Sequence, residues 1–170
     1  GGFGALKIAL RHPDLFAAVA THSAAILPAD PSELAGSAES TVMRFLRGGL
    51  REHLGDPIDP KKWALQMPMG LVALKKPADL KGLQIYFDAG TDDHYGFFEP
   101  NVALAAAMKN NGHKHYFRPV EEGGHAWSSS KMLDNLAHSM GFAGLALSGT
   151  DAVTTLHEAD AKKQAAEAKK

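Results

Sequence analysis

The chain contains no cysteine, no long apolar run and no marked excess of charge of either sign. The absence of cysteine excludes disulfide bonds, thiolate metal sites and a cysteine nucleophile. No apolar stretch approaches the roughly 20 residues of a membrane-spanning helix. With 18 Lys and Arg residues against 19 Asp and Glu, the net charge is −1, so the long-range field that attracts a phosphate backbone is missing. We therefore expect neither nucleic acid nor a membrane among its partners.

A starting methionine is also missing. The sequence opens Gly1-Gly2-Phe3-Gly4, and an apolar helix-like pattern is already under way at Leu6. This start predicts a piece of a longer protein, with any targeting segment lying upstream. The 170 residues, 45% hydrophobic and 22% charged, are typical of one globular domain or part of one.

Strand-like and helix-like segments alternate along the chain. A continuous apolar run typical of a buried strand lies at 15–21, and two further predicted strands lie at 83–87 and 115–119. Helical patterns lie at 6–11, 41–54, 60–66, 70–75, 97–111 and 128–147. The stretch 27–40, rich in Pro, Ser and Asp, is typical of a surface loop. This alternation predicts an α/β fold with a parallel sheet layered by helices.

The last part of the chain differs in composition from the rest. Residues 1–147 form the predicted α/β unit, whereas 148–170 carry alanine and paired charges with little to bury. We expect this tail to be a frayed helix or disordered.

Three segments with chemically reactive or glycine-rich character lie near predicted strand ends. Asp88 to His94 follows the second strand, Glu121 to Trp127 follows the third, and Gly1 to Ala5 leads into a helix. Open α/β sheets bind ligands at the carboxyl ends of their strands. An acid after one strand and a histidine after the next is the order in which α/β hydrolases supply the acid and base of a catalytic triad.

These segments resemble the Putative esterase family of α/β hydrolases, which includes esterase D, S-formylglutathione hydrolases, tributyrin-type esterases and mycolyltransferases. The similarity lies in GGFGALKIALRHPDLFAAVATHSA, GDPIDPKKW, YFDAGTDDHY and GGHAW, and extends over 1–142. It implies the C-terminal half of an α/β-hydrolase domain, with the last three parallel strands and their helices. The strand that carries the nucleophile would then lie upstream.

The same resemblance implies where the nucleophile lies. The family's elbow has the pattern G-x-S-x-G-G, and Gly1 and Gly2 match its last two glycines. The serine would therefore stand two residues before Gly1, and residues 1–170 alone would be inactive.

The resemblance implies Asp93 as the triad acid, because the family's G-x-x-D turn matches Gly90 to Asp93. Asp92 and Asp88 are the alternatives in that order. Such an acid would hold one imidazole nitrogen and fix its tautomer. From the residues alone, the Asp pair could instead cap the helix that begins near Phe97.

His125 is the predicted catalytic base. Gly123 and Gly124 precede it, and glycines there would let the backbone turn sharply and present the ring at a strand end. The alternative is a buried structural histidine. Trp127 and His22 are weaker candidates for substrate binding. An aromatic residue like Trp127 is more often plain core, and Ser and Thr beside His22 are more often turn formers.

Two other patterns resemble functional motifs but do not indicate a catalytic or metal site. Ser139 lies in an elbow-like Ala137 to Gly141 segment, but the leading glycine is missing and the pattern is helical. His113 precedes the third strand and His115 begins it, so both lie at the end of the sheet opposite Asp92, Asp93 and His94. No H-E-x-x-H spacing exists, and we expect no metal site.

The resemblance predicts a serine carboxylesterase or thioesterase that hydrolyses a small-molecule acyl ester or thioester with no cofactor. The alternatives are acyl transfer to another alcohol, and a non-catalytic binding module with the same fold. A serine two residues before Gly1 favours the enzyme, and Gly or Ala there favours the binding module.

Overall fold

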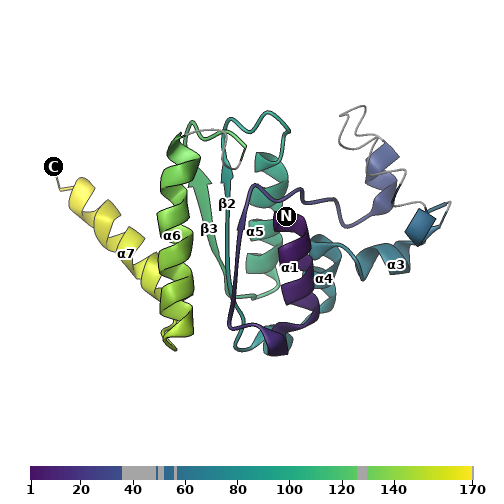
Figure 1. The fold of residues 1–170 in the computed structure, drawn as a ribbon, viewed down its shortest axis with the longest axis horizontal. Helices are drawn as coiled ribbons and strands as arrows, with labels where there is room; N and C mark the ends of the chain where they lie inside the picture. Colours follow the sequence, from purple (N-terminus) through teal and green to yellow (C-terminus); the bar gives the residue numbers. More distant parts are fainter. Residues whose placement is uncertain (36–48, 50–51, 56, 126–129, 170) are drawn as a thin grey trace.

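The computed structural model describes residues 1–35, 49, 52–55, 57–125 and 130–169, arranged as Figure 1 shows. The helices are α1 (Gly2–Arg11), α3 (Pro60–Ala64), α4 (Pro68–Leu74), α5 (Phe98–Asn110), α6 (Ser130–Leu147) and α7 (Ala152–Glu167). The strands are β1 (Ala18–His22), β2 (Gln84–Gly90) and β3 (Tyr116–Val120). Short 3-10 helices span Pro13–Leu15, Pro31–Ala35 and Pro77–Leu80.

The three strands form one parallel sheet in the order β1-β2-β3. The central strand β2 pairs on both sides, so that Asp88 lies opposite His22 of β1 and opposite Arg118 of β3. Parallel strands end at the same side of the sheet, which we call the carboxyl edge. The predicted α/β class with a parallel sheet is confirmed.

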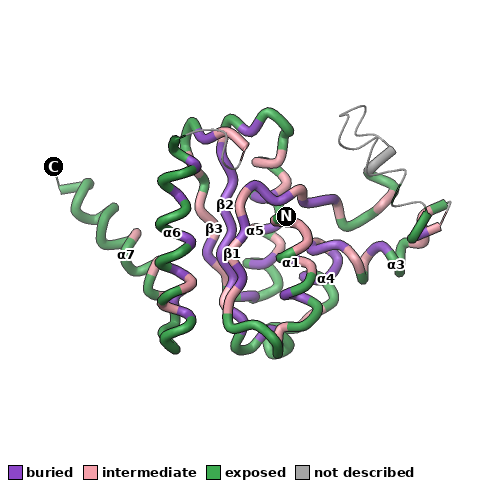
Figure 2. The backbone as a smooth tube through the Cα atoms, viewed as in Figure 1, coloured by how far each residue is buried: buried purple, intermediate pink, exposed green. Residues whose placement is uncertain are grey.

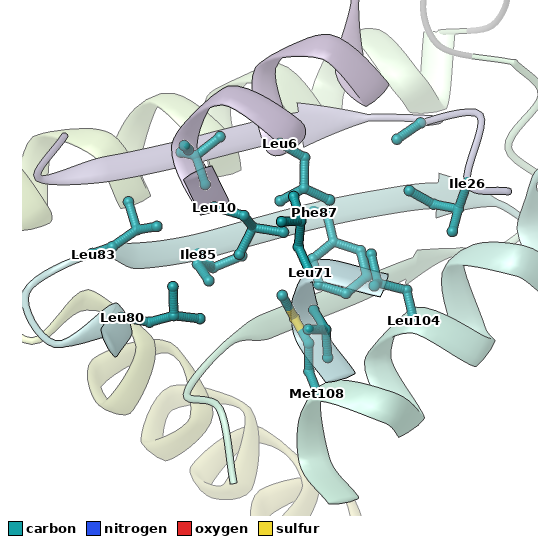
Figure 3. Packing of buried hydrophobic residues seen from close by; sticks show 14 residues of the cluster. Leu6, Leu10, Ile26, Leu71, Leu80, Leu83, Ile85, Phe87, Leu104 and Met108 are labelled. Atoms are coloured by element: carbon teal, nitrogen blue, oxygen red, sulfur yellow. The ribbon is translucent and has the colours of Figure 1, made fainter. Parts of the chain in front are cut away.

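Helices cover both faces of this sheet, with α1, α4 and α5 on one face and α6 and α7 on the other (Figure 1). Side chains alternate along β2, so Ile85 and Phe87 enter the first core and Tyr86 the second. Figure 3 shows the first core, where Leu6 of α1 and Leu104 of α5 meet Phe87. The buried positions are concentrated along the sheet (Figure 2).

A smaller hydrophobic cluster lies apart from the two sheet cores. Its buried members are Leu27, Leu54, Trp63 and Met67. The Trp63 indole Nε1 donates a hydrogen bond to the Pro28 carbonyl at 2.9 Å. This contact joins α3 to the segment that leaves β1.

The strand boundaries differ from those predicted. The first strand begins at Ala18 because Pro13–Leu15 forms a 3-10 turn, and proline suits the first position of such a turn. β2 continues to Gly90, so Asp88 lies within the strand although Asp is depleted from strands. The alternate positions Ala18, Ala20 and His22 of β1 are only half-buried. The predicted helix at 41–54 lies largely outside the described residues.

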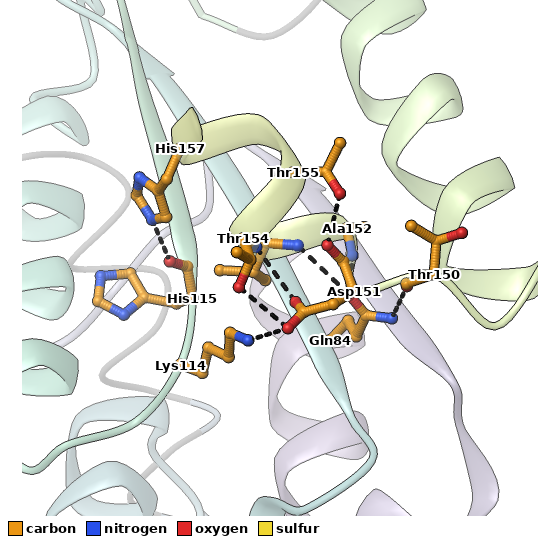
Figure 4. A network of polar contacts seen from close by, with 10 residues as sticks. Gln84, Lys114, His115, Thr150, Asp151, Ala152, Thr154, Thr155 and His157 are labelled. Carbon is orange, nitrogen blue, oxygen red and sulfur yellow. Dashed lines mark hydrogen bonds and ion pairs between the residues drawn. The ribbon is translucent and has the colours of Figure 1, made fainter. Parts of the chain in front are cut away.

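The segment after Ser148 contains a well-formed helix, and its first turn is packed. Ala152 and Val153 are buried in the second core. The Gln84 side chain accepts a hydrogen bond from Ala152 N and donates one to Thr150 O (Figure 4). The first turn of α7 therefore buries side chains that the composition of the tail did not indicate, whereas the second half of the helix is exposed. The sequence pattern of residues 148–170 does not indicate this contact, because only the first turn of α7 is apolar.

Polar contacts fix the next turns of α7 on β3. The Tyr116 hydroxyl donates to Asp160 at 2.6 Å, and the His157 ring contacts the His115 carbonyl at 3.0 Å. Burial, and then the Asp160 carboxylate, raise the pKa of Tyr116 to about 12. The phenol therefore stays protonated and able to donate at neutral pH.

None of the helices in the described part of the chain combines the length and the apolar character needed to cross a bilayer.

The ends of β2 and β3 approach each other closely at the carboxyl edge, where two glycines leave room for a backbone contact. A Cβ atom on Gly90 would lie 2.1 Å from the Gly123 carbonyl oxygen. Two backbone bonds also join these strand ends, from Thr91 N to Val120 O at 3.0 Å and from Asp92 N to Gly123 O at 2.9 Å. Only a residue without a side chain fits at position 90.

We predict that Gly90→Ala destabilises the protein by about 1–3 kcal/mol, because the new methyl group overpacks a backbone contact. Gly141→Ala is the matched control, since a Cβ at this position in α6 has nothing within 4 Å. The control should gain about 0.5–1 kcal/mol, because alanine loses less entropy in a helix. Urea unfolding of both variants and the parent measures the difference. A Gly90→Ala variant as stable as the parent would contradict the contact.

Candidate active site

The predicted acid and base lie side by side at the carboxyl edge. Asp93 follows β2, His125 follows β3, and His125 Nδ1 lies 2.9 Å from Asp93 Oδ2. The Asp93 side chain is completely buried, whereas 29% of the His125 side chain is exposed. A buried carboxylate therefore holds an imidazole that solvent or a ligand can reach.

Asp93 is itself held in a tight turn. Its Oδ1 accepts a hydrogen bond from Tyr95 N at 2.9 Å, and its carbonyl accepts one from Gly96 N at 2.9 Å. Gly96 has φ of 73°, in the left-handed region that glycine adopts without strain. A carboxylate oxygen accepts hydrogen bonds, so this contact favours the His125 tautomer that carries its proton on Nδ1.

The two alternative acids do not contact His125. Asp92 is exposed, and its carboxylate accepts a hydrogen bond from the Thr91 hydroxyl at 3.2 Å. The Asp88 carboxylate forms a hydrogen bond with a different histidine, His22. Helix α5 begins at Phe98 without a side-chain cap, so the Asp pair does not cap it.

Aromatic rings surround the His125 imidazole. Tyr95 and Phe97 meet it edge to face, with ring centroids 4.7 Å and 5.5 Å away, and His94 lies at 6.2 Å. These contacts restrict the ring's rotation without forming hydrogen bonds to it. Sequence reasoning did not single out Tyr95 or Phe97, although both follow Asp93 within the same loop.

The backbone conformation of the turn before His125 differs from the predicted one. Glu122 has φ of 54° and takes the left-handed conformation, whereas Gly123 and Gly124 have no positive φ. Glu122 N donates to the Thr91 hydroxyl at 2.9 Å, which fixes this strained residue to the acid loop. The need for glycine at 123 comes from crowding by Val120 and Met132, not from backbone rotation.

A cavity of about 770 Å³ opens beside His125. Its walls include Gly1 and Phe3 at the start of α1, His22 and Ser23 at the end of β1, and Phe97. Ser23 has φ of 44° and donates its backbone N–H to Asp88 O at 2.9 Å. The cavity thus joins two of the three segments that the sequence singled out, Gly1 to Ala5 and Glu121 to Trp127, and reaches the loop after β2 only at Phe97.

The family model described as Putative esterase matches residues 1–135. The chain belongs to this esterase family. The match includes Asp93 and His125 and confirms the resemblance found in the sequence.

Among solved structures, a ferulic acid esterase matches with a TM-score of 0.54 at 23% identity. The match covers 82% of this chain and 46% of that one, so this chain spans about half the length of that structure. The similarity shows a shared α/β fold. No curated protein matches the chain.

The other candidates in this esterase-family chain lie elsewhere. Trp127 falls outside the described residues. Ser139 is buried in α6, where its hydroxyl donates to the Leu136 carbonyl of the same helix at 3.0 Å. His113 precedes β3 and contacts the Val72 carbonyl, at the end of the sheet opposite Asp93. The described residues contain no group of three or more His, Asp or Glu side chains placed to hold a metal ion.

We predict that neutral His125 carries its proton on Nδ1, because Asp93 accepts from that nitrogen. Two-bond ¹⁵N–¹H correlations of the labelled imidazole distinguish the tautomers. Asp93→Asn should shift the population away from the Nδ1–H form, and Asp92→Asn should leave it unchanged. A parent protein with the proton on Nε2 would show that the hydrogen bond does not form in solution.

Proposed function

We propose that this chain is part of a serine carboxylesterase or thioesterase that acts on a small-molecule acyl ester. The observation that carries the proposal is the buried Asp93 carboxylate bonded to the partly exposed His125 ring beside a cavity. The esterase family of the chain agrees with this chemistry.

The proposed nucleophile is a serine two residues before Gly1. Gly1 and Gly2 line the same cavity as His125, so the chain that enters α1 and the imidazole face a common space. Gly2 packs against the end of β1, where a Cβ would lie 3.0 Å from the His22 carbonyl. This close packing supports an elbow at that position, with the upstream residue presented to His125.

In the proposed reaction, the serine oxygen attacks the acyl carbonyl carbon, and its proton passes to Nε2 of His125. Collapse of the tetrahedral intermediate expels the alcohol or thiol, which takes that proton. Water then attacks the acyl-serine and gives a proton to His125. The carboxylic acid leaves and the serine oxygen recovers the proton. Asp93 keeps the tautomer and stabilises the imidazolium in each step.

We predict that Asp93→Asn lowers kcat by about 10³- to 10⁴-fold in a protein extended upstream to include the serine, because the imidazole loses its orienting acceptor. Asp92→Asn is the matched control and should change kcat little, since its carboxylate faces solvent. Turnover of p-nitrophenyl acetate measures both. The reverse ranking would show that Asp92 is the functional acid.

The same assay tests the position of the nucleophile. Residues 1–170 alone should show no turnover above a His125→Ala version. Turnover by residues 1–170 that His125→Ala abolishes would place the nucleophile inside this chain, with Ser139 as the first candidate. A protein that binds the ester without turnover, even with the upstream segment, would favour the binding module. Ester product formed with an added alcohol, in place of acid, would favour acyl transfer.

We further predict that a chelator leaves the turnover unchanged, because the proposed steps use only serine, His125 and Asp93. Dialysis against EDTA followed by the p-nitrophenyl acetate assay measures this. Loss of activity that a divalent metal restores would replace the serine mechanism by a metal-assisted one.

A further inference from the structure

The turn that leads from β3 to His125 has a strained residue at its third position. Residues 120–123 form this turn, and Gly123 N closes it with a hydrogen bond to the Val120 carbonyl at 3.0 Å. Glu122, the third residue, has φ of 54°. Glycine or asparagine normally occupies a turn position with positive φ, because the backbone crowds a larger side chain there. We therefore expect a contact from outside the turn to hold Glu122 in this conformation.

The side chain of Thr91, in the loop that carries the acid, supplies that contact. Glu122 N donates a hydrogen bond to Thr91 Oγ1 at 2.9 Å. The same hydroxyl donates its own proton to Asp92 Oδ1 at 3.2 Å. A hydroxyl group has one proton to donate and lone pairs to accept with, so both bonds can form together. Two linked hydrogen bonds thus run from the turn after β3 to the loop after β2 through one side chain.

The other contacts between these two loops do not depend on a side chain at these positions. Thr91 N donates to the Val120 carbonyl, and Asp92 N donates to the Gly123 carbonyl. Both bonds use backbone atoms only, and they hold the residues on either side of Glu122 without fixing φ at Glu122 itself.

The charge of Glu122 is a weak constraint on the turn. Its carboxylate pairs with Lys131 of α6, but 77% of the Glu122 side chain and 46% of the Lys131 side chain are exposed. An ion pair with this exposure contributes little to the conformation of the chain. The Thr91 hydroxyl is therefore the stronger side-chain constraint on the backbone of Glu122.

The conformation of Glu122 affects the position of His125, which stands three residues further along the chain. A change of φ at Glu122 would redirect the backbone that follows it. Asp93 stands two residues beyond Thr91. The hydrogen bond from Glu122 to Thr91 and the contact of His125 with Asp93 at 2.9 Å therefore join the same two loops at neighbouring points.

We propose that Thr91 is a positioning residue for the acid and base. Its hydroxyl keeps Glu122 in the left-handed conformation and thereby holds the His125 ring within hydrogen-bond reach of Asp93. The catalytic meaning of this role rests on the proposed esterase function. The placement of the ring can be measured without turnover, so the two proposals can fail separately.

The first test compares Thr91→Val, which removes the hydroxyl and keeps the branched shape, with Thr91→Ser, which keeps the hydroxyl. The protein is extended upstream to include the serine, and p-nitrophenyl acetate is the substrate. Thr91→Val should lower kcat by about 3- to 10-fold, the value of one hydrogen bond, because fewer molecules hold the ring in place. KM should stay unchanged, and Thr91→Ser should restore kcat.

The second test measures the imidazole directly. Two-bond ¹⁵N–¹H correlations of His125 should show a smaller Nδ1–H population in Thr91→Val than in the parent, and the parent population in Thr91→Ser. Thr155→Val is the matched control, because it removes a hydroxyl that donates to the Asp151 carbonyl of α7 at 2.8 Å. This control should change neither the tautomer nor kcat.

The third test relieves the strain instead of removing the bond. Glycine adopts positive φ without strain, so Glu122→Gly should make the Thr91 hydroxyl less necessary. Glu122→Gly alone should keep the parent kcat, and added to Thr91→Val it should recover most of the lost kcat. Glu122→Gln removes only the charge that faces Lys131, so it should not rescue Thr91→Val.

Three outcomes would overturn the proposal. They are a Thr91→Val variant with the kcat and tautomer of the parent, a Thr91→Ser variant that loses as much as Thr91→Val, or no rescue by Glu122→Gly. A Thr91→Val variant that is less stable in urea but keeps the parent tautomer would assign Thr91 a purely structural role and would also overturn it. Failure of the esterase function is a separate result, because His125→Ala would then leave turnover unchanged while the tautomer still reports on Thr91.

Discussion

The backbone contact between Gly90 and Gly123 is the constraint on which the candidate site depends. The loops after β2 and β3 can supply an acid and a base to one point only if the two strand ends lie close together. Here no side chain separates them, and three hydrogen bonds join the loops. The 2.9 Å distance between His125 and Asp93 follows from this contact, because each side chain stands only a few residues beyond its strand.

The central strand β2 supplies acids to two histidines of different character. Asp93 lies beyond the strand, where its oxygens are shared between a ring nitrogen and a backbone N–H. Asp88 lies inside the strand and depends on His22 and Asn135. The same chain segment thus places one buried carboxylate in a tight turn beyond the strand and one inside the sheet.

Much of the fold could be predicted from the sequence, because apolar runs and turn residues mark the strands directly. The pairing of Asp93 with His125 could be predicted because a family pattern covers both. Other features depend on distant partners that no local pattern shows. Asp88 remains in a strand because His22 and Asn135 satisfy it, and Glu122 takes the left-handed conformation because Thr91 holds it. Likewise α7 packs through a single turn, whose partners come from β2.

The small cluster around Trp63 has a consequence for local stability. It shares no buried residue with the sheet cores, and the indole bond to Pro28 closes it. Such a cluster can open as a sub-global unit while the sheet and its two carboxylates stay folded. Amide hydrogens of α3 would then exchange with solvent at a lower free energy than those of β2.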